Sequence, residues 1–104
     1  VDERNRNGDT PFLCASDHGH TAILGLLANS HGADPSATNA QGQGALHKAC
    51  HNGHEGTALE LLQSHGLDSN RQDCLGRSAL HLAAARGSAS LVSLLVREGG
   101  NVDI

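Results

Sequence analysis

Residues 76–87 read GRSALHLAAARG and hold the outline of a short capped helix: a turn glycine, Ser78 as the cap, an alanine-rich apolar stretch and Gly87 as the stop. The same outline occurs at residues 42–53 (GQGALHKACHNG) and at residues 8–19 (GDTPFLCASDHG). The leading glycines are evenly spaced, since 42 − 8 = 34 and 76 − 42 = 34. A fixed period of this size predicts a protein built from stacked repeats.

Each copy is predicted to contain two short helices followed by a loop. In the first copy Thr10 is placed to cap a helix and Pro11 to begin it, because a threonine hydroxyl accepts an unpaired N–H and proline lacks one. The second helix of this copy carries an apolar face at i, i+3 and i+4 spacing. We expect this face to be buried; it consists of Ile23, Leu24, Leu26 and Leu27.

Neither helix of a copy can bury its apolar face alone, so neighbouring copies must cover it. The sequence therefore predicts an all-α solenoid of stacked helix-turn-helix units joined by hairpin-like loops. We expect a single domain over residues 1–104, with repeats at approximately 5–38, 39–72 and 73–104.

The composition narrows the range of functions. Aromatic residues make up 1% of the chain, so the core must be built from leucine, isoleucine, valine and alanine. The net charge of −4 argues against nonspecific binding to nucleic acid or to an anionic membrane, which needs a strongly basic surface. No apolar run approaches the roughly 20 residues of a membrane span. Cys14, Cys50 and Cys74 have no CxxC spacing, which favours free thiols and an intracellular compartment, cytoplasmic or nuclear.

The repeated motifs resemble those of ankyrin repeats, in which T-P-L-H opens the first helix, G-H joins the helices, L-L ends the second and G-A-D follows. This chain has Thr-Pro-Phe at residues 10–12 and Ala-Leu-His at 45–47 and 79–81. Gly-His occurs at 19–20 and 53–54, and Leu-Leu at 26–27, 61–62 and 94–95. Loop sequences follow at 32–34, 66–68 and 99–101. Because three sets of motifs are in phase, the resemblance covers essentially the whole chain.

The resemblance implies a protein-interaction module or scaffold with no catalytic activity and no cofactor. It implies structural roles for Thr10, Pro11, Ser78 and the two histidines His47 and His81, which bond within the turn and tie adjacent units. Ankyrin repeats bind their partners through loop tips and the exposed side of the first helices. In this sequence the implied partner-binding residues are Arg6, Asn7, Asp9, Asp17, His18, Gln41, Gln43, Lys48, His51, Asn52, Leu75, Arg77, Ala85 and Arg86.

Basic residues gather on the loop and first-helix side, and Arg97 is the only one of the seven assigned to a second helix. We therefore expect a protein or peptide partner with acidic residues, anchored by Arg77 and Arg86, with Leu75 as an apolar contact. We expect the unit to act as a monomer and to bind neither nucleic acid nor a membrane.

A second interpretation stays open at this stage, namely a regulatory or ligand- or metal-responsive segment of a larger enzyme or channel. His47, Cys50, His51 and His54 are zinc-competent and lie at helical spacing. Histidines that recur in phase without cysteine explain this cluster more simply, so we expect no metal. The chain has no P-loop, no G-x-S-x-G and no H-E-x-x-H, and we expect no enzyme activity.

Small differences in length separate the repeats. The glycines that bound the second helix are 13 residues apart in repeats one and two (32 − 19 and 66 − 53) but 12 apart in repeat three (99 − 87). We place the extra residue after Leu27 in repeat one and near residues 55–56 in repeat two. The third repeat keeps the apolar face of an internal unit, so we expect the chain to belong to a longer array.

Overall fold

The computed structural model describes residues 4–30, 32–65, 67 and 71–98. These residues form six helices and no strand, so the all-α prediction is confirmed for the part of the chain that is described. The helices are α1 (Pro11–Asp17), α2 (Thr21–Ser30), α3 (Ala45–His51), α4 (Glu55–Ser64), α5 (Ala79–Arg86) and α6 (Ala89–Arg97).

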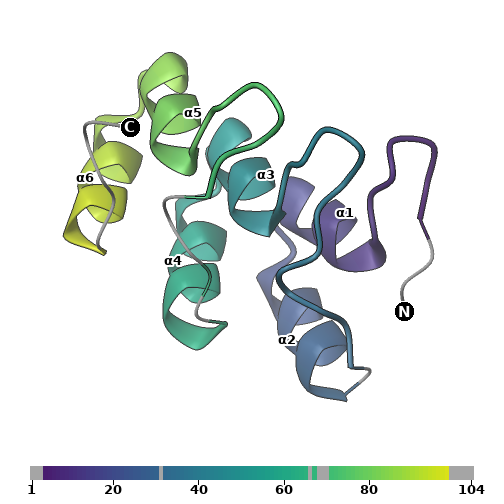
Figure 1. Ribbon diagram of the computed structural model, residues 1–104. Coiled ribbons are helices and arrows are strands. Elements are labelled where there is room, and N and C mark those ends of the chain that lie inside the picture. The colour runs from purple at the N-terminus through teal and green to yellow at the C-terminus, as the bar shows by residue number, and fades with distance from the viewer. Residues whose placement is uncertain (1–3, 31, 66, 68–70, 99–104) are drawn as a thin grey trace.

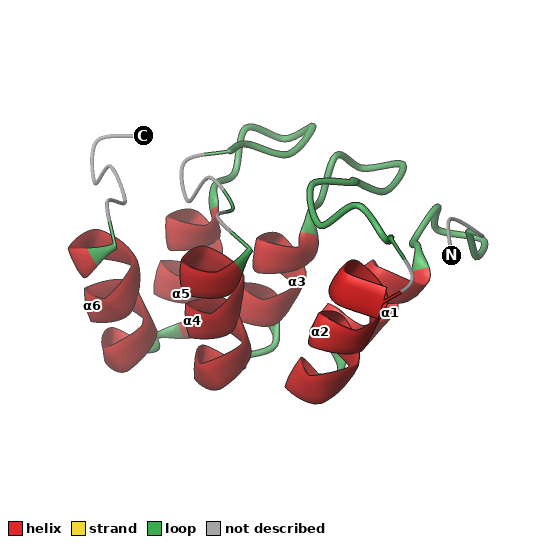
Figure 2. Cartoon of the chain, turned by 90° about the horizontal axis from the view of Figure 1, so that it is seen from below, coloured by secondary structure: helices red, strands yellow, loops and turns green. Residues whose placement is uncertain are grey.

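The helices are arranged in two rows. In Figure 1, α1, α3 and α5 lie side by side, and α2, α4 and α6 form a second row beside them. Within the first row α1 packs against α3 and α3 packs against α5, and each of these three helices also packs against the helix that follows it in the chain. Figure 2 shows that the loops before α1, α3 and α5 all project from the same end of the rows.

The helices of the first row begin at the positions that the sequence indicates. Thr10 has an extended backbone, and its hydroxyl oxygen accepts the N–H of Leu13 at 3.3 Å. Pro11 follows at the first helical position. At the other end, Gly87 terminates α5 with φ = +80°, a left-handed conformation that glycine adopts without steric cost.

The core lies between the two rows and between successive repeats. Its largest fully buried side chains are Phe12 and the leucines Leu13, Leu24, Leu61, Leu91 and Leu95. Alanines at the contacts within the first row are almost completely buried, among them Ala49 and Ala83, each 0% exposed. The absence of long side chains at these positions lets neighbouring helices approach closely.

Two sequence-based predictions about the second helices are wrong. Ile23 is 44% and Leu26 is 53% exposed, so only part of the predicted apolar face of α2 is buried. The equivalent residues of repeat three, Leu91 and Leu94, are buried; among the described residues a repeat precedes α6 in the chain, whereas none precedes α2. The extra residue of repeat two does not lie near residues 55–56, because α2, α4 and α6 all begin two residues after Gly19, Gly53 and Gly87. Instead, α2 and α4 are ten residues long and α6 is nine, so α2 and α4 end one residue later relative to these glycines.

Candidate functional site

The three projecting loops share one hydrogen-bonded construction. A side-chain oxygen at residue 5, 39 or 73 accepts two backbone N–H groups, those of the second and the fourth residue that follow, at 2.9–3.0 Å. A glycine with φ between +74° and +79° completes each turn, at Gly8, Gly42 and Gly76. The acceptors are Asn5, Asn39 and Asp73. These side chains hold the loop tips in a defined shape.

Neighbouring loops are also tied to one another through their backbones. The N–H of Ala40 donates to the carbonyl of Asn7 at 3.2 Å, and the N–H of Cys74 donates to the carbonyl of Gln41 at 2.9 Å. The loop tips therefore form a continuous row along one edge of the molecule, visible in Figure 2.

Asp9 lies at the centre of a buried polar network between the first two repeats. Its side chain accepts the Nδ2–H of Asn39 at 2.9 Å and lies 3.4 Å from the Nζ of Lys48. Asp9 is only 6% exposed. The structure thus places Asp9 and Lys48, both predicted to face a partner, in a contact that joins repeats one and two.

Asp17 and Asn52 form a second contact of this kind. The Nδ2–H of Asn52 donates to both the carbonyl and the carboxylate of Asp17. The Nε2 of His54 also lies 3.0 Å from the Asp17 carbonyl oxygen. Both predicted residues are therefore engaged across the repeat boundary, with part of each side chain still accessible to solvent.

His47 joins the second and third repeats. Its Nδ1 accepts the N–H of Gly44 at 3.2 Å, so the proton is on Nε2, which donates to the carbonyl of Arg77 at 2.9 Å. Burial lowers the pKa of His47, although the hydrogen bond to the Arg77 carbonyl partly opposes this shift. In the third repeat, the Nδ1 of His81 bonds to the N–H and the hydroxyl of Ser78.

A shallow depression of about 260 Å³ lies on the exposed side between α3 and α5. It is lined by His51, Arg77, Leu82, Ala85 and Arg86. Leu82 is 5% exposed, and His51, Ala85 and Arg86 are exposed. Four of the five lining residues were predicted partner-binding residues; Leu82 was not. The depression brings together side chains that are 35 positions apart in the sequence (86 − 51).

The two arginines of this depression differ in their surroundings. The Nε–H of Arg77 donates to the carboxylate of Asp73 at 2.9 Å. Burial raises the pKa of Asp73, but the backbone N–H groups of Arg77 and Leu75 and the Arg77 guanidinium outweigh it and hold that pKa below its usual value. Arg86 donates through Nη1 to a neutral acceptor, the carbonyl of His51, at 3.2 Å. Arg86 therefore contributes the less compensated positive charge.

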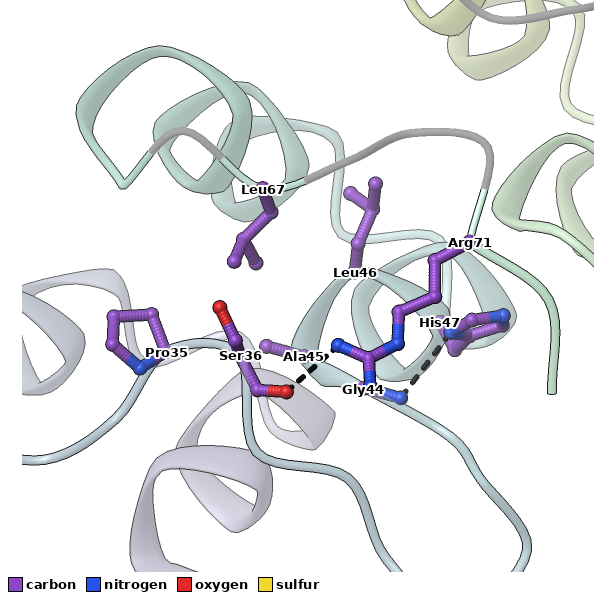
Figure 3. A pocket seen from close by; sticks show the side chains of 8 residues that line it. All are labelled: Pro35, Ser36, Gly44, Ala45, Leu46, His47, Leu67 and Arg71. Carbon is purple, nitrogen blue, oxygen red and sulfur yellow. Dashed lines mark hydrogen bonds between the residues drawn. The ribbon is translucent and has the colours of Figure 1, made fainter.

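A second hollow, of about 180 Å³, lies beneath the loops (Figure 3). Leu46, Leu67 and Pro35 form apolar walls, and Arg71 crosses it to donate to the carbonyl of Ser36 at 2.9 Å. Gly44 lines this hollow and has no side chain, whereas the equivalent positions are Thr10 and Ser78. The missing side chain accounts for part of this space.

The family of the chain follows from its comparison with known proteins. The family model for ankyrin repeats matches residues 12–104, with three copies. The chain belongs to the ankyrin-repeat family. Ankyrin repeats are generally protein–protein interaction modules and typically carry no enzyme activity. No curated protein matches the chain.

In this ankyrin-repeat structure the predicted partner-binding residues fall into two groups. Arg6, Asn7, His18, Gln41 and Leu75 are exposed, as are three residues of the depression described above. Leu75 stands out because it is apolar and 76% exposed at a loop tip. The others are half-buried or buried and take part in hydrogen bonds or ion pairs: Asp9, Asp17, Gln43, Lys48, Asn52 and Arg77.

The four residues weighed as zinc ligands do not converge. The His47 and His54 rings bond to carbonyl groups of different repeats, Cys50 is fully buried and His51 is exposed. Burial raises the pKa of Cys50 to about 12, which disfavours the thiolate that a metal needs. Within the described ranges, no three potential ligands come together to hold a metal. None of the helices described has the length and apolar character needed to cross a membrane.

The side chains that shape the loops were not among the residues predicted from the sequence. Asn5, Asn39 and Asp73 occur at a spacing of 34 (39 − 5 and 73 − 39), each three residues before a turn glycine. Asparagine and aspartate often bond to the N–H two residues on. The combination of this residue type, this spacing and the glycine was therefore a usable signal.

Proposed function

We propose that this chain is a segment of an ankyrin solenoid that binds a protein or peptide along its loop tips and the exposed side of its first helices. The depression between α3 and α5 is the centre of this surface. We propose that the chain acts as a single copy inside the cell, in the cytoplasm or nucleus, and that it needs no cofactor. The chain carries out no catalysis and binds neither nucleic acid nor a membrane.

The observation that best supports the proposal is the depression itself. It combines an apolar floor, Leu82, with two arginines and a histidine at its edge. Binding sites in proteins commonly pair an apolar base with a few polar groups at the rim, and arginine is enriched among residues that dominate binding energy. Leu75, on the loop that leads to Arg77, offers an additional apolar contact.

The charges in this region favour a partner with acidic side chains. Arg86 bonds to a neutral carbonyl and keeps its full charge, while Arg77 is already paired with Asp73. A carboxylate of the partner is therefore expected to interact more strongly with Arg86 than with Arg77. The partner's carboxylate would accept charge-assisted hydrogen bonds from Arg86, and the contact between Arg77 and Asp73 would stay in place.

The proposal can be tested with a library of displayed random peptides selected on the intact chain. We expect the selected peptides to be enriched in Asp and Glu and to bind less tightly as salt is raised. For these peptides, Arg86→Glu should raise the dissociation constant at least tenfold. Leu75→Ser should weaken binding by a smaller factor.

The matched control is Arg97→Glu, because Arg97 is exposed on α6 and the substitution changes the net charge equally. It should leave the affinity unchanged. Equal losses with Arg86→Glu and Arg97→Glu would mean that only net charge matters and would refute the proposed site. A selection that yields no binding peptide, or none sensitive to Arg86, would count against this surface as the binding site.

A further inference from the structure

The hollow beneath the loops (Figure 3) is large enough to hold a small molecule. Its volume is about 180 Å³, and an engineered apolar cavity of about 150 Å³ binds benzene. The walls come from three segments of the chain: the loop after α2, the start of α3 and the loop after α4. A body of the size of one six-membered ring therefore fits between the loops of successive repeats.

Much of the wall of this hollow is apolar. Figure 3 shows the side chains of Pro35, Leu46 and Leu67 around it. Leu46 is only 4% exposed, whereas Pro35 and Leu67 are half-buried. A body placed between these side chains would cover apolar surface that solvent now reaches, and such burial is favourable in proportion to the area covered. The hollow therefore favours a ligand with an apolar body.

Gly44 keeps one side of the hollow open. A Cβ at this position would meet only Thr38 Cγ2 at 3.8 Å and His47 Nδ1 at 3.9 Å, which are ordinary contacts. The equivalent residues of repeats one and three are Thr10 and Ser78, which both carry a side chain (44 − 10 = 34 and 78 − 44 = 34). The opening at this position is therefore particular to repeat two among the three repeats of the chain.

The charge of the hollow is positive. Among the described residues that line it, Arg71 is the only one with a permanent charge. Its Nη1–H donates to the carbonyl of Ser36 at 2.9 Å, and a guanidinium has five N–H groups, so it has the capacity to bind a second acceptor. The ring nitrogens of His47 already bond to the Gly44 N–H and the Arg77 carbonyl, so this ring offers no further polar atom.

We propose that the hollow binds a small monocarboxylic acid with a compact apolar body. The body lies between Pro35, Leu46 and Leu67, and the carboxylate accepts N–H groups of Arg71 in charge-assisted hydrogen bonds. An amine of the same size is repelled by Arg71. The hollow shares no lining residue with the depression between α3 and α5, so this site is separate from the proposed partner-binding surface.

Benzoate is the probe for the test, because it joins one six-membered ring to one carboxylate. It is titrated into the intact chain while the methyl signals of Leu46 and Leu67 are followed by NMR. We expect both residues to report binding with a dissociation constant of about 1–10 mM, the range of a ligand of this size. Benzyl alcohol, which has the ring without the charge, should bind at least fivefold more weakly. Acetate and benzylamine should leave these methyl signals unchanged.

A bound acid should also stabilise the folded chain, since it contacts three segments that only folding brings together. With benzoate at about ten times its dissociation constant, we expect the thermal midpoint of unfolding to rise by about 4 °C or more. The reference is the midpoint in acetate at the same concentration, which corrects for ionic strength.

Two variants test the charge and the space separately. Arg71→Gln removes the charge and should raise the dissociation constant of benzoate at least fivefold, to the value for benzyl alcohol. Gly44→Thr places the side chain of repeat one in the hollow and should raise it at least threefold without loss of folding. The matched control is Arg97→Gln, the same substitution at an exposed position of α6, which should leave the constant unchanged.

Several outcomes would overturn the proposal. One is the absence of any shift of the Leu46 and Leu67 methyl signals up to 50 mM benzoate, about five times the weakest affinity expected. Another is an equal loss of affinity in Arg71→Gln and Arg97→Gln, which would show that benzoate senses only net charge. Benzyl alcohol that binds as tightly as benzoate would exclude the carboxylate contact. Unchanged affinity in Gly44→Thr would place the ligand outside the hollow.

Discussion

The Nε2 of His47 lies 2.9 Å from the carbonyl oxygen of Arg77, and this single bond joins the loop of the third repeat to the first helix of the second. The same ring accepts the N–H of Gly44 through Nδ1. His47 is 3% exposed, so its two hydrogen bonds are shielded from water. Repeat one has Leu13 at this position, completely buried and without a bond of this kind.

Replacing His47 by leucine should remove the two hydrogen bonds of the ring and keep the position filled, because the equivalent residue of repeat one, Leu13, is a buried leucine. We expect His47→Leu to lower the free energy of unfolding by about 1–3 kcal/mol, since the Gly44 N–H loses its acceptor and the Arg77 carbonyl loses the donor from the preceding repeat. Urea unfolding measures the change. The matched control is His81→Leu, because His81 is exposed and bonds only within its own repeat among the described residues; its loss should be smaller. Equal losses would contradict the importance of the contact between repeats.

The stability of the protein should fall in mild acid because of His47. Its pKa is lower in the folded chain than the ordinary value of about 6.5 in the unfolded chain. Between these two values the unfolded state binds more protons, so the free energy of unfolding decreases as the pH falls below about 6.5. Urea unfolding at a series of pH values measures the slope. In the His47→Leu variant the slope should be reduced, and an unchanged slope would show that other groups cause it.

Gly44→Thr should stabilise the protein by about 0.5–1 kcal/mol or less, because threonine caps slightly better than glycine and restricts the unfolded chain. A Cβ at Gly44 meets only Thr38 Cγ2 at 3.8 Å and His47 Nδ1 at 3.9 Å, which are ordinary contacts. Thermal unfolding measures the effect. The contrasting variant is Gly42→Ala, which should destabilise by about 1–2 kcal/mol, since Gly42 has φ = +74° and its Cβ would lie 3.0 Å from the N of Cys74. A loss of stability in Gly44→Thr would mean that the hollow of Figure 3 does not accept the side chain.

Asn39→Asp should destabilise the protein by about 1–3 kcal/mol at neutral pH. The aspartate keeps the oxygen that accepts the N–H groups of Gln41 and Gln43, but it replaces the Nδ2–H donor to Asp9 by a second carboxylate. Two carboxylates within hydrogen-bonding distance in a buried site repel each other and so destabilise the folded state. The loss should shrink as the pH is lowered and one carboxyl group is protonated. The comparison is Asn5→Asp, an exposed site whose Nδ2–H donates to Asp9 over a longer distance, 3.5 Å, so a smaller loss is expected there.

Much of the local structure could be predicted because its causes are local. Thr10 and Pro11 begin α1, and Gly87 ends α5, through bonds and φ angles that involve only nearby residues. The 34-residue period likewise predicted short paired helices, and the described residues form helices and no strand, as expected. The error at residues 55–56 arose because the spacing of glycines gives the length of a segment but not the position of an extra residue within it.

The candidate site was harder to predict, because exposure depends on contacts between repeats. Asp9, Lys48, Asn52 and Arg77 are polar residues on the loop and first-helix side, as the sequence indicated. Their partners lie in another repeat or in a loop turn, so their engagement could not be inferred from their own positions. The depression between α3 and α5 requires Leu82 as its floor, and a leucine in an alanine-rich helix indicates burial only.

From the order of its residues alone, the chain specified three in-phase copies, the caps and stops of their helices, and the side that carries the basic residues. These features depend on backbone conformation and bonds within a few positions. Only the packing of one repeat on the next decided that Ile23 and Leu26 are exposed while Leu91 and Leu94 are buried. The physical reason is that all four residues are equally apolar, and burial depends on whether a neighbouring helix covers them.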